Sequence, residues 1–85
     1  MASVVYTVIL DPETDPEGSG FNVRVPALPG CFTQGATVDE AMARAREAVS
    51  LYLESMIAHG EQIPVEDVTP RLESVAFDVP ALASA

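Results

Sequence analysis

The sequence contains no lysine and no tryptophan, one cysteine, one histidine and no long apolar run. A lone cysteine cannot form a disulfide within the chain, so we expect a reducing compartment and a cytoplasmic protein. No apolar stretch approaches the roughly 18–20 residues that span a bilayer, and no secretory signal is visible at the amino terminus. Phosphate loops, paired C-x-x-C motifs and G-x-S-x-G are also absent, so the sequence offers no positive case for an enzyme.

Acidic side chains dominate the charge. Thirteen aspartates and glutamates oppose four arginines, and the formal net charge is −9. Such a field repels nucleic acid, whose phosphates are bound by clustered Lys and Arg, so we expect no direct nucleic-acid binding. It attracts a basic partner and speeds the encounter with it. The alternative is that the charge only keeps a small domain soluble, and composition alone favours that alternative.

Length and composition predict one small folded domain. The 85 residues are 48% hydrophobic and 20% charged, which is too apolar for a disordered chain. We expect the domain to span residues 1–79 and a short mobile tail to follow at 80–85. A chain of this size has a thin core, so a homodimer or higher homo-oligomer is expected because it adds buried area.

Hydrophobic periodicity predicts four strands and one helix. Strands are expected at 4–10, 21–25, 31–34 and 72–79, and the helix at 38–59, ended by Gly60. In the second strand Phe21, Val23 and Val25 share one face, while Asn22 and Arg24 share the other. The order β-β-β-α-β predicts an α+β fold, with the helix packed on one face of a mainly antiparallel sheet.

The connection from Val25 to Ala41, V-P-A-L-P-G-C-F-T-Q-G-A-T-V-D-E-A, is the most informative segment. Its two prolines fix φ near −65°, and Gly30 and Gly35 permit positive φ. Thr37 and Glu40 form a T-x-x-E capping box, in which each residue accepts from the backbone N–H of the other. These are backbone roles, so we interpret the segment as a structural motif.

Two candidate sites in this chain have simpler explanations. Asp11, Glu13, Asp15 and Glu17 alternate like the start of a calcium loop, but prolines interrupt them and Asn22 stands at the twelfth position. A solvated acidic hairpin loop is favoured there, and no metal is expected. Cys31 and His59 offer the only thiol and imidazole for a catalytic dyad.

A buried small side chain and a helix C-terminal cap are the favoured roles for that cysteine and histidine. The helix acids Asp39 and Glu40 suit the first helical turn. Glu47 and Glu54 share one side of the helix, where they form either a partner-facing acidic strip or a solvated face.

The spacing P-x-L-P-G-C-x-T-x-G-x-T-x-x-E-A resembles the signature of the HicB-like antitoxins of bacterial type II toxin–antitoxin systems. The likeness extends through Y-T-V-I-L-D-P-E and G-F-N-V-R-V-P before the signature. It continues in A-R-E-A-V-S-L-Y-L and H-G-E-Q-I-P after it. The residues that carry the signature are Pro26, Pro29, Gly30, Cys31, Thr33, Gly35, Thr37, Glu40 and Ala41.

The resemblance implies a partial ribonuclease-H-like β-β-β-α-β fold without catalysis, cofactor or metal. It implies a protein-binding module that covers the active site of a small basic HicA toxin, an mRNA-cleaving ribonuclease. The chain ends soon after its last predicted strand, so we expect a short form without the C-terminal DNA-binding module that many members carry.

Two alternatives stay open: an orphan oligomeric regulatory or structural protein without a toxin, and a hydrolase using Cys31 or a metal. The candidate partner contacts are Asn22, Arg24, Thr33, Gln34, Glu47 and Glu54.

Overall fold

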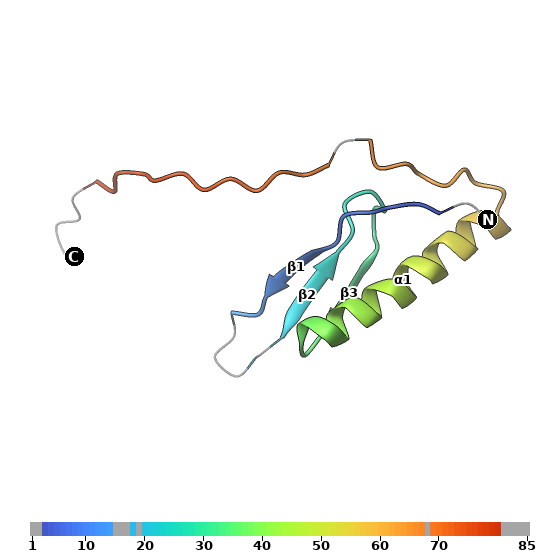
Figure 1. The fold of residues 1–85 in the computed structure, drawn as a ribbon, viewed down its shortest axis with the longest axis horizontal. Coiled ribbons are helices and arrows are strands. Elements are labelled where there is room, and N and C mark those ends of the chain that lie inside the picture. The colour runs from blue at the N-terminus through green and yellow to red at the C-terminus, as the bar shows by residue number, and fades with distance from the viewer. Residues whose placement is uncertain (1–2, 15–17, 19, 68, 81–85) are drawn as a thin grey trace.

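The computed structural model of the protein describes residues 3–14, 18, 20–67 and 69–80. In this described part of the chain three strands precede one helix: β1 (Ile9–Pro12), β2 (Phe21–Arg24), β3 (Phe32–Gly35) and α1 (Val38–Ala58). The strands form one antiparallel sheet in the order β1-β2-β3, and α1 packs on one face of it, mainly over β3 and β2 (Figure 1). The expected α+β arrangement is confirmed.

Small side chains hold the start of the helix close to the sheet. Val23 of β2 is buried together with Ala41 and Ala45 of α1, and Leu10 and Phe21 pack against this cluster. Alanine projects only a methyl group, so the helix axis can approach the strands closely. The predicted division of β2 into an inward face with Val23 and an outward face with Asn22 and Arg24 is confirmed, because both polar residues are exposed.

A second cluster lies under the connection between β2 and β3. Val25, Leu28 and Cys31 are buried there, and Val49, Tyr52 and Leu53 are among the helix residues that pack against them. Leu28 is completely buried. The turn closes through a backbone hydrogen bond from the Leu28 N–H to the Val25 carbonyl and another from the Cys31 N–H to the Leu28 carbonyl, at 2.9 and 3.0 Å.

Both ends of α1 are capped at the residues that the sequence predicts, and of the predicted capping box the structure shows the bond to the Thr37 hydroxyl. The Thr37 hydroxyl accepts from the Glu40 N–H at 3.1 Å. At the other end Gly60 has φ of +71°, and the Glu61 and Gly60 N–H groups donate to the carbonyls of Met56 and Ile57. This pair of bonds is the Schellman arrangement, which satisfies the last helical carbonyls.

Two strands begin later than the sequence predicts. The apolar run 4–10 is not one buried strand: β1 starts at Ile9, which pairs with Arg24 at the end of β2, so residues 4–8 have no strand of this sheet opposite them. The strand expected at 31–34 lies one residue further on, at Phe32–Gly35. Hydrophobicity alone marks neither boundary, because both depend on where β2 ends.

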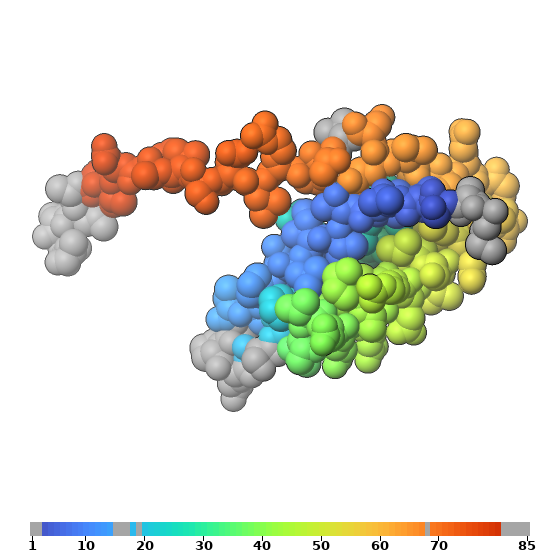
Figure 2. All heavy atoms as spheres, viewed as in Figure 1, coloured from blue at the N-terminus to red at the C-terminus, as the bar shows by residue number. Residues whose placement is uncertain are grey.

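The strand predicted at 72–79 does not join the sheet, and this prediction was wrong for a single copy of the chain. Residues 71–80 are all exposed and follow an extended path away from the body, orange to red in Figure 1. The space-filling view in Figure 2 shows the same segment projecting from the other elements. Most of the mobile tail expected at 80–85 lies outside the described residues.

Candidate functional site

The face of the sheet that α1 leaves open carries three of the candidate contacts. Asn22 stands opposite Gln34 across the β2–β3 pair, and Arg24 stands opposite Phe32. All four side chains are exposed, and Phe32 keeps 70% of its surface accessible. Phe32 was not among the candidates from the sequence, although its alternation with Cys31 and Thr33 would have placed it on this face.

This open face has little net charge. Arg24 Nε lies 3.1 Å from Asp11 Oδ2, so the one cation of the face is paired with an acid of the neighbouring strand. Thr33 does not belong to the face: it pairs with Val23, is half-buried and points to the helix side. The structure therefore separates Thr33 from Gln34.

The outer side of α1 is acidic. Glu40, Glu47 and Glu54 are all exposed and recur every seven residues, so they follow one side of the helix at intervals of about 10 Å. We call these three residues the acidic strip. Among the described residues the salt bridges join Arg24 to Asp11 and Arg71 to Glu73, so the strip glutamates are left unpaired. Glu40 was assigned only a capping role from the sequence, although its spacing from Glu47 would have revealed the strip.

The acidic strip and the open sheet face lie on opposite sides of the molecule. The helix contacts the sheet through residues such as Ala41 and Ala45, and at 100° per residue Glu47 and Glu54 point away from that contact. Asn22 and Arg24 point away from the helix on the far side of the sheet. The six candidate contacts therefore do not form one site.

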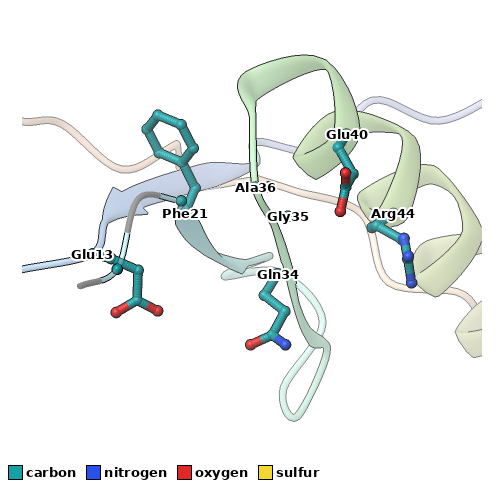
Figure 3. A pocket seen from close by; sticks show the side chains of 9 residues that line it. Glu13, Phe21, Gln34, Gly35, Ala36, Glu40 and Arg44 are labelled. Carbon is teal, nitrogen blue, oxygen red and sulfur yellow. The ribbon is translucent and has the colours of Figure 1, made fainter. Parts of the chain in front are cut away.

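A hollow of about 460 Å³ lies where β3 turns into α1 (Figure 3). Glu40 and Arg44 reach it from the helix, Gln34 from β3 and Glu13 from the turn after β1. It is wide open to solvent and holds neither a thiol nor an imidazole. The hollow offers polar contacts at the end of the acidic strip but no nucleophile paired with a base.

The thiol and the imidazole are both held by local structure. Cys31 is buried beside Val25 and Leu28, and this burial raises the pKa of its thiol, which disfavours the reactive thiolate. His59 caps α1, and its Nδ1 lies 2.7 Å from the carbonyl oxygen of Ser55 on the same helix. The predicted structural roles of both residues are confirmed.

No group of three or more His, Cys, Asp or Glu side chains could hold a metal ion within the described ranges. Asp15 and Glu17 of the candidate calcium loop fall outside those ranges, while Asp11 is paired with Arg24. Across the same ranges no helix is sufficiently long and apolar to cross a membrane.

Gly30, Gly35 and Pro29 of the 26–41 motif act through the backbone, whereas Leu28 and Cys31 place side chains in the core. Gly30 has φ of +82° and so takes the left-handed conformation expected of it. Gly35 does not: its role is close approach to α1, which corrects the interpretation from the sequence. The Pro29 carbonyl accepts from the Tyr52 hydroxyl at 2.7 Å, which ties the turn to the helix.

The 26–41 segment thus forms the turn that covers Leu28 and the cap that begins α1. The chain matches the model of the HicB-like antitoxin of bacterial toxin–antitoxin systems over residues 6–78. The chain belongs to this family. The signature at 26–41 lies inside the matched range.

Relatives of this HicB-like chain include two named as UPF0150 proteins. One, from Thermoplasma acidophilum, is 48% identical over 67 residues, which are 75% of this chain and 93% of that protein. The other, from Synechocystis sp., is 43% identical over 63 residues, covering 74% of this chain and 76% of that protein. An uncharacterized 14.9 kDa protein of Haemophilus phage HP1 is 38% identical over 61 residues, which are 72% of this chain and 43% of that protein.

Proposed function

We propose that this HicB-like protein is an antitoxin that binds a small basic HicA-type toxin and covers the active site at which the toxin cleaves mRNA. Family membership supports a role in a toxin–antitoxin system. The single observation that supports a basic partner is the acidic strip, on a chain of net charge −9.

The acidic strip is the better contact surface for such a toxin. Its carboxylates are exposed and unpaired among the described residues, so no existing salt bridge has to break when a cation binds. The open sheet face lacks this advantage, because Arg24 already neutralises Asp11. Charged surfaces of opposite sign raise the association rate and fix the orientation of the partner.

The test is binding of a purified HicA-type toxin, measured by titration calorimetry at low and high salt. The proposal predicts a tight complex whose affinity falls as NaCl rises, since salt screens exposed charges. Replacing Glu47 and Glu54 by Lys should weaken binding strongly. The matched control replaces Asp67 and Asp78 by Lys, which gives the same net charge away from the acidic strip and should retain most of the affinity.

Three outcomes of this experiment would contradict different parts of the proposal. No binding of the wild-type chain would overturn the antitoxin assignment. Equal losses in the two charge-reversed variants would show that overall charge, and not the acidic strip, attracts the partner. Unchanged affinity in both variants would place the contact on another surface.

A further inference from the structure

The segment 71–80 presents an exposed apolar side. From here on we call this segment, and not residues 80–85, the tail. Val75, Phe77 and Val79 alternate along the extended chain, so their side chains project in the same direction. They keep 66, 81 and 75% of their surface exposed. Single exposed apolar side chains are common on proteins, but a continuous apolar row marks an interaction surface.

The tail is part of the family's domain. The family match runs to residue 78 and so includes most of the tail. The tail also makes the molecule extended: the Cα radius of gyration is 17.4 Å, whereas a compact chain of this length would have about 12 Å. The tail therefore belongs to the matched family region but lies outside the core of its own copy.

The free edge of β1 is a suitable acceptor. Among the residues that the structure describes, β1 pairs with β2 on one side and with no strand on the other. The Glu13 N–H donates to the Gly20 carbonyl, so by the two-residue period the N–H and C=O of Leu10 point away from β2. A strand laid along this edge would satisfy those groups, which is the mode of binding called β-augmentation.

An apolar groove of about 480 Å³ borders residues 4–8, which lead into β1, and the flank of α1. A strand that pairs with β1 and continues beside residues 4–8 would turn one row of its side chains into this groove. The sheet therefore offers backbone partners and an apolar pocket side by side. The residues that line most of the groove are Val4, Val5, Val8, Met42, Ala45 and Val49.

The segment that leads into the tail is anchored to the same copy in a register that does not bring the tail to this groove. The Tyr6 hydroxyl donates to the Pro64 carbonyl, and Glu66 accepts from the Thr7 N–H and hydroxyl, each at 2.6 Å. The two segments of the chain that meet here, 6–7 and 64–66, therefore run in the same direction. Val75 lies nine residues beyond Glu66, about 30 Å along an extended chain, whereas β1 ends five residues beyond Thr7. Val75, Phe77 and Val79 therefore lie beyond the end of the sheet of their own copy.

We propose that the tail of one copy adds a fourth strand to the free edge of β1 in a second copy, with Val75, Phe77 and Val79 in that copy's apolar groove. Reciprocal exchange of two tails forms a closed dimer with two equivalent contacts. Both copies carry a charge of −9, so salt should strengthen this apolar association by screening their repulsion. This response is opposite to that expected of the toxin complex, and it is measured on the protein alone.

The experiment is sedimentation equilibrium of the full chain and two matched variants. V75D/F77D places two charges on the apolar row, and S74D/A76D places two on the opposite side of the same segment. Neither pair contacts the core, so circular dichroism should show unchanged helix content in both. We expect a wild-type dimer, a similar dimer for S74D/A76D and at least about 100-fold weaker dimerisation for V75D/F77D.

Three results would overturn the proposal. A monomeric wild-type chain would show that the tail has no partner copy or folds back on its own sheet. A V75D/F77D dimer as tight as the wild type would place the dimer contact elsewhere. Equal weakening in both variants would show that added charge, and not the apolar row, controls association.

Discussion

Gly35 and Ala41 lie so close together that a Cβ atom on Gly35 would stand 2.6 Å from the Cα of Ala41. Both residues belong to the signature segment, at the end of β3 and the start of α1. The obstructing atoms are backbone, which cannot swing aside as a flexible side chain can. Glycine at 35 therefore sets how closely the first helical turn approaches the sheet.

We predict that Gly35→Ala lowers the free energy of unfolding by about 3 kcal/mol, the upper end of the usual range for overpacking. Gly30→Ala is the comparison, because Gly30 has positive φ but no atom within 4 Å of an added Cβ. Its expected cost is about 1–2 kcal/mol, from left-handed backbone alone. Urea unfolding measures both, and a larger loss for Gly30→Ala would contradict the close-approach role of Gly35.

Leu28 is the other internal support of the signature segment. Because it is fully buried under the turn, Leu28→Ala should cost about 2–5 kcal/mol of unfolding free energy. Leu51→Ala makes the same chemical change on a side chain that is 66% exposed, and should stay within about 0.5 kcal/mol. Similar thermal midpoints for the two variants would show that the turn does not depend on this side chain.

Burial of Cys31 predicts slow reaction with thiol reagents in the native protein. The raised pKa and the cover of the surrounding cluster both keep the thiolate scarce and inaccessible. A colorimetric disulfide reagent should label the thiol rapidly only after denaturation. Rapid labelling of the native chain would reopen the hydrolase alternative that uses Cys31.

The link between Glu66 and Thr7 should weaken in acid. The side-chain and backbone hydrogen bonds from Thr7 lower the pKa of Glu66 below its usual value. A lowered pKa in the folded chain means that the stabilisation is present above pH about 4.3 and is lost as the pH falls through the folded value. The protection of the Thr7 amide against hydrogen exchange should therefore fall in that acidic range.

Glu66→Gln provides the control for this titration, since an amide still accepts a hydrogen bond but does not ionise. The change in Thr7 protection with pH should be much smaller in Glu66→Gln. Glu61→Gln, at an exposed position, should behave like the wild type. Equal pH dependence in all three chains would mean that another group controls this contact.

Local signals in the sequence predicted the parts of the fold that depend on neighbouring residues. The cap at Thr37, the turn glycines at 30 and 60, and the alternating faces of β2 each require only a few consecutive residues, and the structure confirms them. The role of Gly35 was misjudged because a close approach depends on Ala41 in three dimensions, and glycine alone does not distinguish this from positive φ.

Predictions that need a distant partner were less successful. The apolar alternation at 72–79 has the pattern of a strand, but a strand forms only where another offers a free edge in the right register. The candidate contacts also divided between the open sheet face, the outer side of α1 and, for Thr33, the covered side of the sheet, because sequence spacing within β2 or α1 does not show which side of the sheet the helix covers. The place of Glu40 in the acidic strip follows from its seven-residue spacing to Glu47, which the sequence analysis overlooked by assigning Glu40 only a capping role.

Inhibition of RNA cleavage tests the central claim most directly. A purified HicA-type toxin is incubated with mRNA and increasing amounts of the wild-type chain, and cleavage is followed by gel electrophoresis. The proposal predicts that cleavage stops when the two proteins are present in stoichiometric amounts. Undiminished cleavage in a large molar excess of this chain would contradict the antitoxin function.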